Sequence, residues 1–372
     1  MIFLDNSSSS FFKPRCVIEA VKNTIEYLPF NPSRSSHSGA LKAGRLLLSA
    51  RERLAQSFGC DSEGVIFTGG CTEALNLAIF GAGREGGHVI TTVFEHNAVL
   101  RPLHRLNKAG IINLSLVSSV SGAAAAVTDK TYMLVINHVS NVTGAAADLF
   151  AYGEIAKKHG LIFVVDAAQS AGYKQICMKS TGVDCLALAP HKGLHAIAGA
   201  GALLLSDKVI GGALGRFTPF KYGGTGTASS SPVQPDDMPD GFEAGTLPTP
   251  AIASVNTGTA WSIANLKTNA DKLNKMSAYM IEGLEKICGV TVYSHPNDCG
   301  IVAFTIGSMT SQEAGDIYDQ QYDIALRCGF HCAPLLHQHY ETKSGMIRAS
   351  IGVETTISEL DAFLEATKEI SN

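Results

Sequence analysis

The sequence predicts an α/β fold built on a mainly parallel sheet of seven strands. Short apolar runs recur along the first two thirds of the chain, at residues 65–68, 89–92, 111–117, 132–139, 161–165, 184–189 and 202–206. They lack the polar alternation of a half-solvated sheet, and helical stretches separate them, which indicates buried strands with helices on both faces. A chain of 372 residues that is 45% hydrophobic and 17% charged can form a large core, divided into two domains.

The elements before this sheet carry their own signals. A short strand at residues 2–5 precedes the serine run Ser7–Ser10, which predicts a turn rich in hydroxyl groups. Lys13-Pro14 opens a helix whose expected apolar face comprises Val17, Ile18, Val21 and Ile25. A polar loop at residues 31–39 interrupts the pattern. An amphipathic helix from about residue 41 to 58 then has leucines at helical spacing, with its arginines expected outside.

The strand at 65–68 ends in Gly69-Gly70-Cys71-Thr72. A strand, a glycine turn and a helix beginning near Thr72 direct unpaired backbone N–H groups at one point, a geometry that suits a phosphate. The spacing is neither the dinucleotide fingerprint nor a P-loop, and this disfavours ATP. Taken alone, a glycine turn before a helix is more often an ordinary turn than a phosphate site.

Polar residues follow several of the other strands. They are Glu95-His96-Asn97, Ser140-Asn141, Asp166 to Ser170, and His191-Lys192. Open α/β sheets bind ligands at the carboxyl ends of their strands, so these side chains are expected to meet in one site. Lys192 stands between two core strands, where an ammonium group is costly unless it is paired or neutralised. On its own the segment would be an ordinary loop with a surface lysine.

The last third of the chain changes character. Residues 211–250 are rich in glycine, serine and proline, and so long a loop in a compact protein is usually functional or an interface. Residues 254–287 predict one long or broken helix, followed by alternating strand and helix signals. We expect a large domain at residues 15–254 and a smaller α+β domain formed by residues 1–14 and 255–372.

Charge and composition exclude several functions. The net charge is only −4 and no arginine-rich run is present, so nucleic acid is not an expected partner. No stretch reaches the roughly 18 apolar residues of a membrane span, and the first residues lack a signal-peptide pattern, so we expect a cytoplasmic protein. Nine scattered cysteines, an odd number, indicate free thiols.

Five motifs in order along nearly the whole chain carry a family resemblance. They are Glu95-His96-Asn97, Ser140 to Gly144, Val165 to Ser170, His191-Lys192 and Arg327 to Pro334. The set resembles the cysteine desulfurases, pyridoxal 5'-phosphate enzymes of the class V aminotransferase family. His331-Cys332-Ala333-Pro334 is typical of desulfurase and selenocysteine lyase members. The resemblance implies a fold-type I homodimer in which both subunits build each active site.

The resemblance also implies cofactor-binding roles. Lys192 is the expected Schiff-base lysine, and Asp166 pairs with the pyridinium nitrogen so that the ring acts as an electron sink. His96 stacks on the ring as a third catalytic residue beside Lys192 and Cys332. The remaining expected cofactor contacts are Gln169 and Asn141 near the ring oxygen, Cys71, Thr72 and His191 at the phosphate, and Thr246 at the partner subunit's phosphate.

Arg348 matches the family's substrate-carboxylate arginine, beside which Asn141 also contacts the substrate, L-cysteine or L-selenocysteine. The implied reaction removes sulfur from L-cysteine as a persulfide on Cys332 and releases L-alanine, with Lys192 as proton shuttle. A sulfur-acceptor protein is a possible further partner. The alternatives are selenocysteine lyase or another cysteine C–S lyase, a transaminase or epimerase in which Cys332 is incidental, and a non-catalytic sulfur carrier or scaffold.

Some positions depart from the family pattern. Ala189 and Pro190 replace a serine or threonine phosphate ligand, the serine run replaces Ala-Ala-Thr-Thr, and Val353-Glu354-Thr355 replaces a Tyr-Asn-Thr segment. These changes concern phosphate affinity and the substrate pocket. Cysteines and histidines also crowd together between residues 328 and 339, but their spacing matches no common zinc pattern, so no metal is expected.

Overall fold

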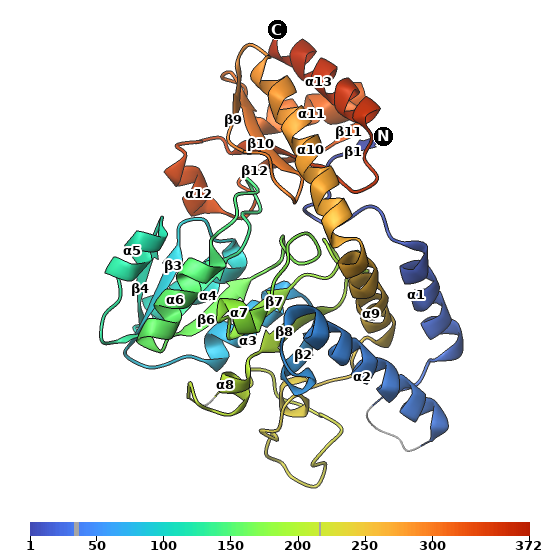
Figure 1. Ribbon diagram of the computed structural model, residues 1–372, viewed down its shortest axis with the longest axis vertical. Helices are drawn as coiled ribbons and strands as arrows, with labels where there is room; N and C mark the ends of the chain where they lie inside the picture. The colour runs from blue at the N-terminus through green and yellow to red at the C-terminus, as the bar shows by residue number, and fades with distance from the viewer. Residues whose placement is uncertain (33–36, 216) are drawn as a thin grey trace.

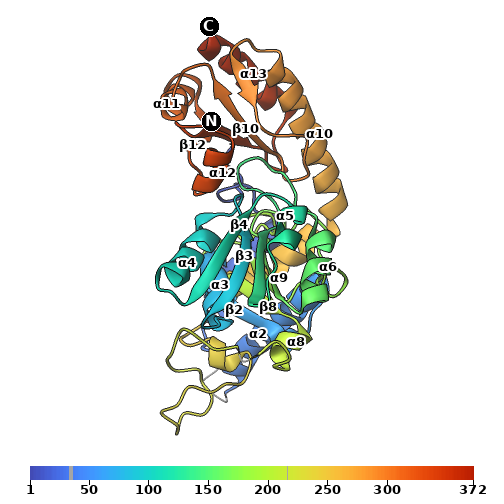
Figure 2. The same ribbon diagram turned by 90° about the vertical axis from the view of Figure 1, so that its left-hand side faces the viewer.

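The computed structural model describes residues 1–32, 37–215 and 217–372. Residues 33–36 of the predicted polar loop lie outside this range. Two lobes are evident in both views (Figures 1 and 2): one contains a seven-stranded sheet and the other a four-stranded sheet, and both chain termini lie in the second lobe.

The seven-stranded sheet confirms the predicted fold class. Its strands, in spatial order, are β2 (Val65–Thr68), β8 (Gly201–Leu205), β7 (Cys185–Leu188), β6 (Ile162–Asp166), β5 (Thr131–Asn137), β3 (Gly87–Thr92) and β4 (Ile112–Val117). Neighbouring strands are parallel except that β8 runs antiparallel to both β2 and β7. The strands from β5 to β8 are buried along their whole length, as their continuous apolar runs predict.

Helices cover both faces of this sheet. The larger core contains side chains of α2 (Ser38–Phe58), α5 (Val120–Ala125), α6 (Leu149–His159) and α9 (Thr249–Ala264). The core on the opposite face contains those of α3 (Cys71–Gly81) and α4 (Asn97–Lys108). Shorter elements are η1 (Ser62–Gly64), α7 (Met178–Thr181), α8 (Asp207–Ile210) and η2 (Asp240–Phe242).

The predicted inner face of the first helix is wrong in part. Helix α1 (Arg15–Tyr27) packs on α9 and buries Val17 and Thr24, which lie two turns apart. Ile18 and Ile25 are 48% and 60% exposed. The surface of α1 that contacts α9 is therefore narrower than the apolar face of the helix.

One arginine of α2 is also inside rather than outside. Arg51 forms an ion pair with Glu243 at 2.5 Å, and its guanidinium lies 4.8 Å from the centre of the Phe67 ring. The backbone N–H of Phe67 donates to Glu243 at 2.5 Å. Burial is tolerated because the charge is paired and its donors are used. This pair fastens the long glycine-rich loop to β2.

The second lobe contains an antiparallel sheet in the order β12 (Arg327–Gly329), β13 (Met346–Ser350), β10 (Ile301–Ile306) and β9 (Val290–Val292). Its core includes side chains of α10 (Leu266–Glu285), α11 (Ser311–Tyr322) and α13 (Ile357–Ser371). The long predicted helix is broken at Asn265, between α9 and α10.

The amino terminus joins this lobe. Strand β1 (Ile2–Phe3) pairs in parallel with β11 (Ile324–Ala325), and α12 (Pro334–His339) follows β12. The serine run forms the predicted turn after β1. Over the three described ranges, no helix combines the length and apolar character needed to cross a membrane.

Candidate active site

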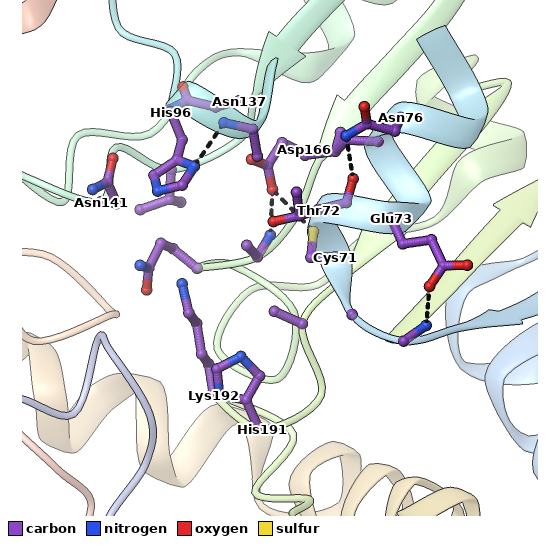
Figure 3. A pocket seen from close by; sticks show the side chains of 18 of the residues that line it. Cys71, Thr72, Glu73, Asn76, His96, Asn137, Asn141, Asp166, His191 and Lys192 are labelled. Carbon is purple, nitrogen blue, oxygen red and sulfur yellow. Dashed lines mark hydrogen bonds between the residues drawn. The ribbon is translucent and has the colours of Figure 1, made fainter. Parts of the chain in front are cut away.

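A cavity of 560 Å³ opens at the carboxyl ends of the parallel strands (Figure 3). It brings together eight of the residues selected from the sequence: Cys71, Thr72, His96, Asn141, Asp166, Gln169, His191 and Lys192. They come from five separate stretches of the chain. The structure thus gathers the polar strand ends at one edge, as parallel topology requires.

One end of the cavity is formed by the glycine turn and the start of α3. Gly70 caps this helix without a side-chain hydrogen bond, so the first N–H groups of α3 lack the usual capping acceptor. The Glu73 carboxylate instead accepts the Gly69 N–H at 2.6 Å and pairs with Lys221 at 3.0 Å. A Cβ at Gly201 would lie 2.4 Å from the Gly70 carbonyl carbon, so glycine is needed for β8 to pass this close.

Lys192 follows β7 and projects into the cavity (Figure 3). Desolvation lowers the pKa of its amine, and the nearby Asp166 carboxylate opposes that shift. Asp166 ends β6 and accepts the Ala168 N–H at 2.9 Å. A lysine whose pKa is lowered has a larger neutral fraction near pH 7, and the neutral amine is the form that attacks carbonyl groups or removes protons.

Cys71 contacts the same carboxylate. Its Sγ lies 3.6 Å from Asp166 Oδ1, and burial, with Asp166 as the next cause, raises the pKa of the thiol well above its usual value. The thiol is therefore neutral and donates to Asp166. The Cys71 side chain thus binds the Asp166 carboxylate, and the backbone N–H of Cys71 remains available to a ligand in the cavity.

His96 caps α4 and is held in one orientation. Its Nδ1 accepts the Ala98 N–H at 3.0 Å. Burial lowers the pKa of the ring, and Lys192 adds to this effect while Asp166 opposes it. A neutral imidazole that accepts at Nδ1 carries its proton on Nε2.

Asn141 and His191 leave polar atoms without a protein partner. Asn141 Nδ2 donates to the His331 carbonyl at 2.7 Å, but its Oδ1 is buried and unpaired among the described residues. His191 Nδ1 is likewise unpaired there, and burial lowers the pKa of its ring to about 4. Gln169 by contrast donates to the Ser7 carbonyl at 3.1 Å. Both unpaired atoms belong to residues that line the cavity, which indicates that a polar ligand belongs there.

Arg348 and Cys332 are near the cavity but do not line it. Arg348, on β13, donates from Nη1 to the Asn141 carbonyl at 2.8 Å and forms an ion pair from Nη2 with Asp5 at 2.8 Å. The Asn97 N–H donates to the Cys332 carbonyl at 2.6 Å. Asn141 therefore connects the cavity with the arginine and, through His331, with the cysteine segment.

The other positions selected from the sequence differ in their relation to the cavity. Thr246 is exposed and does not line the cavity. Ala189 does line it and offers no hydroxyl group. Thr355 accepts the Gly352 N–H at 2.9 Å. Among the residues that the structure describes, no three histidine, cysteine, aspartate or glutamate side chains are grouped to hold a metal ion.

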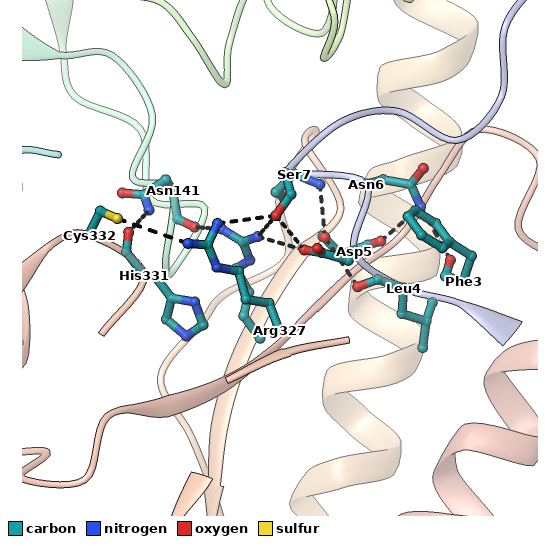
Figure 4. A network of polar contacts seen from close by, with 12 residues as sticks. Phe3, Leu4, Asp5, Asn6, Ser7, Asn141, Arg327, His331 and Cys332 are labelled. Carbon is teal, nitrogen blue, oxygen red and sulfur yellow. Dashed lines mark hydrogen bonds and ion pairs between the residues drawn. The ribbon is translucent and has the colours of Figure 1, made fainter. Parts of the chain in front are cut away.

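Sequence reasoning assigned no role to Asp5, Ser8 or Arg327, although Arg327 stands in one of the motifs. The structure joins these three to Arg348 and Cys332 in one polar network (Figure 4). Glu95 was also left without a role. It is fully buried, and desolvation raises the pKa of its carboxyl to about 8. Arg327 and Glu95 are charged residues within two of the five family motifs, and this position could have indicated a role for each.

The fold and this cavity define an α/β protein with a lysine-containing ligand site at a sheet edge. The aminotransferase class-V family model matches residues 2–363, and the chain belongs to this family, as the motifs suggested. Members of the family are generally pyridoxal-phosphate dependent.

Individual proteins similar to this chain are cysteine desulfurases. The chain is 30% identical over 388 residues to a probable cysteine desulfurase of Methanothermobacter thermautotrophicus, covering 100% of this chain and 94% of that protein. It is 30% identical to the cysteine desulfurase IscS of Vibrio vulnificus, covering 98% and 91%. The apo structure of a cysteine desulfurase from Thermococcus onnurineus matches with a TM-score of 0.88 at 27% identity, covering 100% and 94%.

Proposed function

We propose that this protein is a pyridoxal 5'-phosphate-dependent cysteine desulfurase that converts L-cysteine to L-alanine and retains the sulfur as a persulfide on Cys332. One observation carries the proposal. Asn141 lines the cavity with Lys192, accepts a hydrogen bond from Arg348, and donates one to the carbonyl of His331, the neighbour of Cys332. A cofactor site, a carboxylate-binding arginine and a thiol are thus connected through one residue.

The residues around the cavity have the chemistry that the cofactor requires. The uncapped start of α3, with Thr72, would hold the phosphate, and His191 would add a contact through its unpaired Nδ1. Asp166 would pair with the ring nitrogen, His96 would cover the ring, and Asn141 and Gln169 would lie at its oxygen. Lys192 would bind it covalently. When bound, pyridoxal phosphate supplies an electron sink for bond cleavage at the substrate α-carbon.

Protein side chains would bind the substrate and transfer its protons. Arg348 would bind the substrate carboxylate, because a guanidinium offers parallel donors to two oxygens. Lys192 would take the α-proton and return a proton to the product, since desolvation lowers the pKa of its amine. His96 is neutral and has a proton on Nε2 to donate, so it can assist the same transfer.

Sulfur transfer balances without an external oxidant. The thiolate of Cys332 attacks the substrate sulfur, an S–S bond forms and the substrate C–S bond breaks. The electron pair of that bond stays with the three-carbon fragment, which gains a proton and leaves as alanine. Cys332 keeps the sulfur as a persulfide for a later acceptor, which we propose to be a thiol-bearing protein.

We also propose that the working unit is a homodimer. Thr246 is exposed and lies outside the cavity of its own chain, on the long segment between α8 and α9. A residue so placed is available to a second copy. Its proposed role at the partner subunit's phosphate would then make dimerisation a condition of tight cofactor binding.

The test is an assay of the purified, cofactor-loaded protein with L-cysteine, L-selenocysteine and L-alanine side by side. The proposal expects release of alanine from cysteine with equimolar sulfide when a thiol reductant is present. Release from selenocysteine alone would identify a selenocysteine lyase instead. Amino-group transfer without sulfur release would identify an aminotransferase.

A further inference from the structure

The hydroxyl of Ser8 forms hydrogen bonds with two arginines and one carboxylate. It donates to Asp5 Oδ1 at 2.7 Å. It accepts from Arg348 Nη2 at 3.0 Å and from Arg327 Nη1 at 3.2 Å. Asp5 is also the ion-pair partner of Arg348 at 2.8 Å.

These three bonds use the full capacity of a serine hydroxyl, which has one proton and two lone pairs. The proton is fixed on Asp5, so both lone pairs face the arginines. The two guanidinium groups repel one another. Burial lowers the pKa of Arg348, and Arg327 adds to this effect while Asp5 opposes it. An oxygen between them reduces that repulsion and fixes their separation.

Arg327 faces the proposed nucleophile on its other side. Its Nη2 donates to the sulfur of Cys332 at 3.9 Å. Cys332 itself is held firmly: the Asn97 N–H donates to its carbonyl at 2.6 Å, and both Cys332 and His331 have positive φ angles, of 57° and 47°. The sulfur is therefore presented to the guanidinium by a constrained turn.

Ser8 matters more to Arg327 than to Arg348. Arg348 keeps its bonds to Asp5 and to the Asn141 carbonyl if the Ser8 hydroxyl is removed. The side chain of Arg327 would keep only its contact with the sulfur among the side-chain hydrogen bonds found within the described ranges. Loss of the hydroxyl should thus free Arg327 selectively.

We propose that Ser8 is a positioning residue that holds Arg327 against Cys332, so that the guanidinium stabilises the thiolate that attacks the substrate sulfur. The inference rests on the proposed function and deepens it. It assigns the two arginines separate tasks: Arg348 serves the substrate carboxylate and Arg327 serves the sulfur. Ser8, one of the positions at which this chain departs from the family pattern, connects them.

The experiment compares cofactor-loaded wild type with Ser8→Ala, Ser8→Thr, Arg327→Gln and a matched control, Ser7→Ala. Ser7 lies in the same turn, and its hydroxyl has no bond to either arginine. The first measurement needs no substrate. Cys332 is alkylated with iodoacetate, which is anionic, and with iodoacetamide, which is neutral, and the two rates are taken from its peptide by mass spectrometry.

Positive charge held at the sulfur favours the anionic reagent, so Ser8→Ala and Arg327→Gln should lower the ratio of the two rates by about fivefold. Ser7→Ala should leave the ratio unchanged, and Ser8→Thr should restore most of it. In cysteine turnover, Ser8→Ala should lower kcat about tenfold with KM within about twofold of wild type, because Arg348 keeps its other partners.

An alkylation ratio that is the same in Ser8→Ala and Ser7→Ala would overturn the inference. So would a raised KM with unchanged kcat, because that pattern would place the effect on the substrate carboxylate. A wild-type protein that releases no alanine would instead overturn the proposed function. The two failures are separate because the alkylation ratio does not depend on turnover.

Discussion

The Asp5 carboxylate lies 2.8 Å from the Nη2 atom of Arg348. The arginine proposed to bind the substrate carboxylate therefore already forms an ion pair within the protein. Its Nη1 donates to the Asn141 carbonyl, and its Nε is buried without a partner in the described parts of the chain. Asp5 follows β1 at the amino terminus, whereas Arg348 is on β13. The substrate pocket thus depends on the first residues of the chain.

Substrate affinity should depend on the shape of this arginine as well as on its charge. Arg348→Lys keeps a cation but loses the planar pair of donors, so KM for cysteine should rise about tenfold or more, corresponding to roughly 1.5–3 kcal/mol. Steady-state kinetics of alanine release provide the measurement. Arg15→Lys is the control, since the Arg15 side chain is 82% exposed and pairs with Glu19. A KM unchanged in Arg348→Lys would remove Arg348 from the substrate site.

Lys192→Ala should abolish the covalent attachment of the cofactor without unfolding the protein. Removing a desolvated amine costs little, so the free energy of unfolding should change by no more than about 1 kcal/mol. The measurement is borohydride reduction followed by peptide mass spectrometry, which should find the cofactor on residue 192 of wild type and of Lys179→Ala, and on no peptide of Lys192→Ala. The control Lys179→Ala changes an exposed lysine that pairs weakly with Asp61. A cofactor still bound covalently in Lys192→Ala would place the attachment elsewhere.

The strands and the sheet-edge site follow from local patterns in the sequence. Continuous apolar runs locate the strands because both faces of the sheet are covered, and the polar residues at their ends meet because parallel strands share one edge. The pocket residues from Cys71 to Lys192 could therefore be selected without coordinates, although their roles came from the family resemblance.

Contacts between distant segments could not be predicted in this way. Ser8 and Arg327 are 319 positions apart, and Arg51 and Glu243 are 192 apart. No periodic pattern in the sequence predicts such pairs, and the sequence does not distinguish a buried arginine from an exposed one. The exposure of Ile18 and Ile25 was missed for a similar reason: the width of a helix contact is set by the partner helix.

Acid should destabilise the protein through its buried histidines. Burial lowers the pKa of His195 to about 4, from an ordinary value near 6.5. The unfolded state therefore binds the proton first, and stability is lost as the pH falls from about 6.5 towards 4. His195 lies among aromatic rings, with Trp261 at 5.0 Å, and bonds to the Phe12 carbonyl.

His195→Gln, which keeps a donor but does not titrate, should therefore lose roughly 2 kcal/mol less unfolding free energy than wild type between pH 7 and pH 5. Urea denaturation at both pH values measures this difference. His159→Gln, at the exposed end of α6, should behave like wild type. Equal losses in wild type and His195→Gln would contradict a neutral buried ring.

Glu95 should have the opposite pH dependence. Desolvation raises the pKa of its carboxyl to about 8, so the folded state holds a proton that the unfolded state releases above about pH 4.5. Its contribution to stability is present in acid and is lost as the pH rises towards 8.

Glu95→Gln keeps an oxygen that can accept from Thr92 and from the Asn137 N–H, which bond to Glu95 at 2.6 and 3.0 Å. Its free energy of unfolding should exceed that of wild type by a few kcal/mol more at pH 8 than at pH 5. Denaturation at the two pH values tests this expectation. A difference between the two proteins that does not depend on pH would mean that Glu95 is ionised in the folded state.

The central claim is that Cys332 receives the sulfur. The direct measurement is mass spectrometry of the cofactor-loaded protein after brief incubation with L-cysteine, with each cysteine peptide examined, in wild type and in Cys332→Ala. We expect one added sulfur on the Cys332 peptide of wild type and none on Cys332→Ala, which should retain the cofactor but lose most alanine release from cysteine. Added sulfur on Cys328 or another cysteine, or desulfuration by Cys332→Ala at the wild-type rate, would contradict the claim.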